Sequence, residues 1–61
     1  MGAHDSIEVA HLLFKSLEIA KLKGSLLHWD DIEGDLFVQM DGYFNLEEVA
    51  RQLLKMLDGK N

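Results

Sequence analysis

The chain has 61 residues, a net charge of −5 at pH 7 and no cysteine. A chain of this length forms a single domain, here residues 1–61, and it buries only about 60% of its unfolded surface when it folds alone. Neither disulfides nor thiolate metal sites can supplement its core, which leaves self-association as the common supplement. No apolar run is long enough to cross a bilayer and no secretory signal is visible, so we expect a cytoplasmic protein with no membrane partner.

The first expected element is a helix from Asp5 to Lys23, preceded by a flexible N-terminus at residues 1–4. Asp5 can cap its start, Glu8 follows three residues later, and Gly24 supplies the stop. At 100° per residue, one broad face of this helix is apolar. The residues of that face are Ile7, Val9, Ala10, Leu13, Phe14, Leu17 and Ala20.

A second apolar group falls on the opposite side of the same helix, with Leu12 and Ile19 seven residues apart and Leu22 nearby. A monomer of this size has one core, so a second stripe predicts contact with another subunit. The plainer alternative is scattered exposed apolar residues, which are common on protein surfaces.

Residues 25–40 alternate in a way that predicts a β-hairpin, with Glu33-Gly34 as the turn. A two-residue loop places Trp29 opposite Val38, and a four-residue loop shifts the register by two while keeping the same faces. One face, expected to pack on the helices, holds Leu27, Trp29, Leu36, Val38 and Met40. The other face carries Leu26, Ile32 and Phe37, which we assign to the same interface because an isolated hairpin is marginally stable.

The strongest helix signal runs from Phe44 to Gly59. Asn45 can cap it, Glu48 can complete a capping box, and Gly59 can close it in the left-handed conformation, leaving residues 60–61 as a frayed C-terminus. One face is apolar and is expected to lie on the core. Its residues are Leu46, Val49, Ala50, Leu53, Leu54 and Leu57.

These elements predict an α+β fold of helix, β-hairpin and helix (αββα), completed by homodimerisation. The alternative is a three-helix, all-α fold in which residues 25–33 form a short helix, capped by Ser25 and stopped by Gly34. Trp, Phe and Val in alternation favour strands.

Negative charge is concentrated in the middle of the chain, because no Lys or Arg lies between Gly24 and Ala50. The predicted acidic surface consists of Asp30, Asp31, Glu33 and Asp35. Such a segment repels a phosphate backbone. Its spacing also fails the calcium-loop pattern, since a frame starting at Asp31 places Leu36 where glycine is required.

The sequence contains no motif that is typical of catalysis or of cofactor binding. There is no cysteine, no serine stands in a nucleophile elbow, and the glycines are dispersed rather than clustered in a phosphate-binding loop. His4, Glu8 and His11 have a spacing that suits zinc, but no fourth ligand accompanies them. We therefore expect no enzymatic activity, no cofactor and no metal.

The function expected from these features is that of a non-catalytic protein–protein interaction module, a small acidic adaptor, regulator or inhibitor acting as a homo-oligomer. Its acidic segment suggests a basic protein surface as the partner. The alternative is a small dimeric DNA-binding transcriptional regulator, whose basic edge would hold Lys15, Lys21, Lys23, Arg51 and Lys55. The net negative charge opposes nucleic-acid binding.

Overall fold

A computed structural model describes residues 5–59, so the ends at 1–4 and 60–61, expected to be flexible, lie outside the described residues. Four elements follow one another along the chain: α1 (Ser6–Ala20), β1 (Leu26–Ile32), β2 (Asp35–Asp41) and α2 (Leu46–Asp58). The predicted αββα order and the α+β class are confirmed. The three-helix alternative is not supported, because residues 26–32 form a strand.

The hairpin has the two-residue loop, the first of the two registers considered. Strands β1 and β2 pair antiparallel, with Trp29 opposite Val38 and Ile32 opposite Asp35. Glu33 and Gly34 have φ angles of 53° and 82°. Two positive φ angles in succession are what a two-residue turn needs to match the right-handed twist of its strands.

Helix α1 begins as predicted and ends earlier than predicted. Asp5 accepts a hydrogen bond from the Glu8 backbone N–H at 2.8 Å, but the helix stops at Ala20 rather than Lys23. Lys21 is extended and forms a β-bridge with Phe44. Contacts distant in sequence therefore end the helix, because they hold these residues in extended backbone.

Backbone hydrogen bonds join the residues at the end of α1 to those just before α2, at a place that we call the junction. Leu22 donates to the Tyr43 carbonyl and Asn45 donates to the Ala20 carbonyl, both at 3.0 Å. The Ser25 hydroxyl also accepts from the Tyr43 N–H at 3.0 Å. The hairpin thus leaves the helices and returns to them at one place.

Helix α2 has the predicted cap and a different end. Asn45 accepts from the Glu48 N–H at 3.0 Å, whereas the Asn45 N–H is taken by the Ala20 carbonyl, so the capping box is not completed by Glu48. Gly59 has φ −65° and ψ −8°, so the expected left-handed conformation is wrong. Its N–H donates to the Lys55 carbonyl at 2.8 Å and extends the helical pattern by one more bond.

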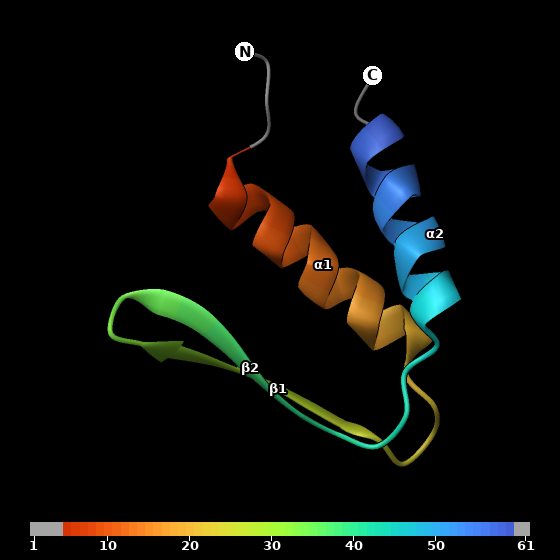
Figure 1. Ribbon diagram of the computed structural model, residues 1–61, viewed down its shortest axis with the longest axis horizontal. Helices are drawn as coiled ribbons and strands as arrows, with labels where there is room; N and C mark the ends of the chain where they lie inside the picture. The colour runs from red at the N-terminus through yellow and green to blue at the C-terminus, as the bar shows by residue number, and fades with distance from the viewer. Residues whose placement is uncertain (1–4, 60–61) are drawn as a thin grey trace.

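The elements form a single layer, with α1 between the hairpin and α2 (Figure 1). The two helices meet at the junction and diverge away from it. Cα atoms extend 38 × 30 × 12 Å. Viewed along the shortest of these directions, no helix within residues 5–59 lies over another element, so the molecule is one layer of elements thick (Figure 1). Among residues 5–59, Ala20 and Val49 are the two hydrophobic residues that are buried.

Candidate interaction surface

The contact between α1 and α2 is centred on a small residue. Ser16 has no exposed surface, and its hydroxyl donates to the Leu12 carbonyl at 2.9 Å and lies 3.9 Å from the Met56 sulfur. A side chain of this size lets the two helices approach closely near Val49 and Ala20.

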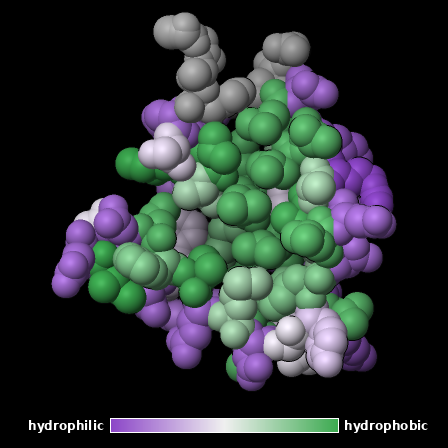
Figure 2. Space-filling model, viewed as in Figure 1, coloured by the Kyte–Doolittle hydropathy of each residue, from purple (hydrophilic) through white to green (hydrophobic). Residues whose placement is uncertain are grey.

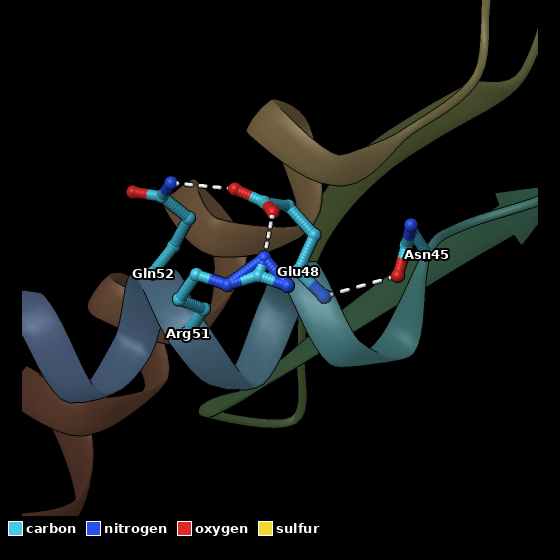
Figure 3. Close-up of polar contacts among 4 residues, drawn as sticks. All are labelled: Asn45, Glu48, Arg51 and Gln52. Carbon is cyan, nitrogen blue, oxygen red and sulfur yellow. Dashed lines mark hydrogen bonds and ion pairs between the residues drawn. The ribbon is translucent and has the colours of Figure 1, made fainter.

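The polar side of α2 is ordered by its own side chains (Figure 3). The Glu48 carboxylate accepts hydrogen bonds from Arg51 and from Gln52, each at 2.7 Å. The hydrogen bond from Gln52 is the largest cause that lowers the pKa of Glu48 below its usual value of 4.5. Burial opposes it, and the positive charge and hydrogen bond of Arg51 and the charge of Lys55 lower the pKa further. This network holds the charged residues on one side of α2, away from its apolar residues.

The apolar side of α2 is largely uncovered, contrary to the expectation that it lies on the core. Leu46 is 78% exposed and Leu54 is 63% exposed, and Ala50 is exposed as well. Leu53 and Leu57 are half-buried. The helical repeat places these five residues together on the side next to the contact with α1.

A matching uncovered surface continues across α1 to the hairpin. Ala10, Leu13 and Leu17 of α1 and Leu36 and Val38 of β2 line a shallow hollow of about 140 Å³. Together with α2 they make one surface, called the apolar face below. Its residues are Ala10, Leu13, Leu17, Leu36, Val38, Leu46, Ala50, Leu53, Leu54 and Leu57. Figure 2 shows hydrophobic side chains covering the middle of the molecule, with hydrophilic side chains at its edges.

An aromatic cluster joins the hairpin to α1 beside this hollow. The Trp29 ring meets the His11 ring edge-on at 4.7 Å between centroids and the Phe14 ring at 5.1 Å. Such geometry is favourable for aromatic pairs. Trp29 therefore packs on a helix as predicted, while Val38 and Met40, expected on the same packed face, remain 42% and 45% exposed.

The interface residues expected from the sequence lie on the other sides of these elements. Ile19, Leu22, Leu26, Ile32 and Phe37 are exposed, and Leu12 is half-buried. On α1, Ile19 is turned well away from Leu13 and Leu17 by the helical repeat. On the hairpin, Leu26, Ile32 and Phe37 alternate with Trp29 and its partner Val38, although Phe37 also lines the edge of the hollow. They stay a hypothesis for a second, separate surface.

The expected acidic surface is brought together by the hairpin turn. Asp31, Glu33 and Asp35 are exposed at its tip, and Asp30 is half-buried. Asp30 Oδ1 lies 3.3 Å from His28 Nε2, because residues two apart on a strand share one face. Across the strands, Ile32 faces Asp35 and Asp31 faces Leu36, so the acids lie on both faces of the tip.

Glu33 occupies an unusual backbone conformation at that tip. It is the non-glycine residue with a positive φ angle within residues 5–59. Left-handed backbone costs a side chain other than Gly, Asn or Asp roughly 1–2 kcal/mol. Glutamate is therefore present at the turn in spite of a conformational cost.

The described part of the chain holds neither a metal-binding cluster nor a membrane-spanning helix. Across residues 5–59, no three His, Asp or Glu side chains gather closely enough to hold a metal ion. His4, which was considered with Glu8 and His11, lies outside the described residues. Neither helix combines the length and apolarity that crossing a membrane requires.

Comparison with protein-family models, with curated proteins and with solved structures gave no match for this chain. The surface itself is therefore the basis for inference. Sequence reasoning had identified the residues of the apolar face and assigned most of them to the core. The length of the chain does indicate that part of these residues stays uncovered. A chain of 61 residues has a single hairpin, which can cover the apolar side of one helix but not of both.

Proposed function

We propose that this protein is a non-catalytic protein–protein interaction module that acts as a homo-oligomer and binds a basic surface of another protein through its acidic hairpin. The observation that carries the proposal is the open apolar face, because soluble monomers rarely leave contiguous apolar surface of this kind exposed. The exposed acids of the hairpin tip supply the surface for the basic partner.

Charge and geometry support the assignment of the hairpin to partner binding. The hairpin projects from the helix pair and ends in Asp31, Glu33 and Asp35 (Figure 1). An exposed cluster of one sign speeds association with a surface of the opposite sign and disfavours wrong partners. The cost of holding Glu33 in left-handed backbone is consistent with selection for its charge rather than for turn stability.

The test compares two triple variants that change the net charge equally. The tip variant neutralises the three exposed acids of the hairpin tip and carries Asp31→Asn, Glu33→Gln and Asp35→Asn. The control variant neutralises three exposed acids of the helices and carries Glu18→Gln, Glu47→Gln and Asp58→Asn. Fluorescence anisotropy with a labelled oligolysine peptide at low salt measures binding. We expect the tip variant to bind at least about tenfold more weakly than the control. Equal losses in both would contradict a role for the hairpin.

The DNA-binding alternative is tested in the same assay with labelled random duplex DNA. We expect no binding at tens of micromolar protein, because the chain carries net negative charge. Salt-sensitive binding to the duplex would overturn the interaction-module proposal and support the regulator.

A further inference from the structure

We propose that a second copy of this chain covers the apolar face, so that two single-layer protomers stack face to face as a two-layer dimer. The inference rests on the homo-oligomer of the proposed function and names the surface it uses. It differs from the interface expected from sequence, which would use Ile19 on another side of α1 and Leu26 on the other side of the hairpin.

The thickness of the molecule calls for a second layer. Stable domains pack at least two layers of secondary structure around one core, and here the whole chain spans 12 Å in its shortest direction. The hairpin, α1 and α2 lie side by side rather than one on another (Figure 1). In a face-to-face dimer, the apolar face of each protomer is buried between the two layers.

The available area suits such a dimer. A standard interface buries about 800 Å² on each partner, and a face with dimensions of 38 × 30 Å has room for it. The accessible surface is 4860 Å², against about 4,000 Å² for a compact monomer of 6.9 kDa. The chain therefore exposes more surface than a compact monomer of its mass.

Charge favours this face over the others for self-association. Each protomer carries a net charge of −5, so two copies repel wherever acidic surfaces meet. All ten residues of the apolar face are uncharged. On α2, Glu48 and Arg51 pair with each other on the side away from Leu53, and stacking leaves them in water. Glu47 and Asp58 border Leu54 at the edge of the face.

The shape of the face is self-complementary. Leu54 projects from α2 with 63% of its surface exposed, and the hollow between α1 and the hairpin measures about 140 Å³. An apolar cavity of about 150 Å³ holds a benzene-sized molecule, so the hollow has room for a leucine side chain. In a two-fold dimer, Leu54 of each copy enters the hollow beside Leu13 of the other, and the contact occurs twice.

The experiment pairs charges across the two-fold axis. We expect Leu54→Lys and Leu13→Glu each to weaken self-association about a hundredfold or more when alone. An equimolar mixture should form a heterodimer, because one contact then joins Lys to Glu while the other keeps both leucines. Native mass spectrometry distinguishes the heterodimer from either homodimer. The matched control Ile19→Lys, exposed on another side of α1, should dimerise like the wild type.

Three outcomes would overturn the proposal. Light scattering that finds wild-type monomer across a hundredfold concentration range rejects the dimer, and with it the homo-oligomer of the proposed function. A dimer that Ile19→Lys disrupts and Leu54→Lys leaves intact rejects this face alone. Failure of the mixture to form a heterodimer while both variants are folded and monomeric rejects the pairing of Leu54 with Leu13.

Carbene footprinting of the wild type decides the question if either variant fails to fold. We expect labelling of Leu46 and Leu54 to fall as protein concentration rises, while labelling of Ile19 and Leu26 stays constant. All four are more than half exposed in the protomer, so they form a matched set. Constant labelling of Leu54 in a dimeric sample would reject the apolar face as its interface.

Discussion

Glu33 has, at the scale of one residue, a backbone conformation that its side chain disfavours. Its φ of 53° suits asparagine better than glutamate, because asparagine tolerates left-handed backbone. We predict that Glu33→Asn raises the free energy of unfolding by about 0.5–1 kcal/mol in urea titrations and weakens oligolysine binding. A variant that is less stable than the wild type would contradict the conformational argument, and unchanged binding would remove Glu33 from the partner surface.

Gly42 is the residue at which the junction tolerates no side chain. It has a φ of 114°, and a Cβ there would collide with the Ser25 side chain and lie 2.9 Å from the Ser25 Cα. We predict that Gly42→Ala destabilises the fold by about 3 kcal/mol or more. Gly24, with a φ of 91° and nothing within 4 Å, is the control, and Gly24→Ala should cost about 1–2 kcal/mol. Equal losses would show that backbone conformation alone matters at Gly42.

Glu48 makes stability depend on pH in a defined direction. Its pKa is lowered in the folded chain, by Gln52 first and then Arg51, so folding favours the carboxylate. The resulting stabilisation is present above pH 4.5 and is lost as the pH falls through the lowered pKa. We predict that Glu48→Gln is less stable than the wild type at neutral pH and that the gap narrows in acid. Urea midpoints measure this, and a gap that is constant with pH would contradict it.

At the scale of elements, the close packing of α1 on α2 depends on the small side chain of Ser16. Because Ser16 is fully buried against Met56, we predict that Ser16→Leu forces the helices apart and costs about 1–3 kcal/mol. Ser16→Ala should cost less than about 1 kcal/mol, since its hydroxyl bonds a carbonyl of the same helix. Thermal unfolding by circular dichroism measures both. A tolerated leucine would mean that the helices are not closely packed at this point.

The elements that sequence predicted correctly are those specified by neighbouring residues. Asp5 and Asn45 cap their helices as expected, and Glu33-Gly34 forms the turn because its local conformation suits it. The end of α1 at Ala20 was not predictable, since the bond from Leu22 to Tyr43 joins residues far apart in the chain. Periodicity likewise identified Leu54 as apolar and could not say whether anything covers it.

The whole molecule, if it dimerises through the apolar face, has a stability that depends on its concentration. Two buried hydrophobic residues among residues 5–59 make a small core, so association through the apolar face would add much of the apolar burial. We predict that the melting temperature rises by a few degrees for each tenfold increase in protein concentration. Leu54→Lys should melt at a constant, lower temperature. A concentration-independent melting temperature in the wild type would argue for a self-sufficient monomer.

The junction also allows the hairpin to change in length without affecting the helices. Lys21 and Phe44 lie side by side in a β-bridge, so the segment between them starts and finishes at one point on the helix pair. Adding two residues to each strand preserves which face each side chain occupies and moves the acidic tip outward by about 7 Å. Loop closure opposes such lengthening by only a few tenths of a kcal/mol. The reach of the tip can therefore change, in evolution or in design, without any change to the helices that carry it.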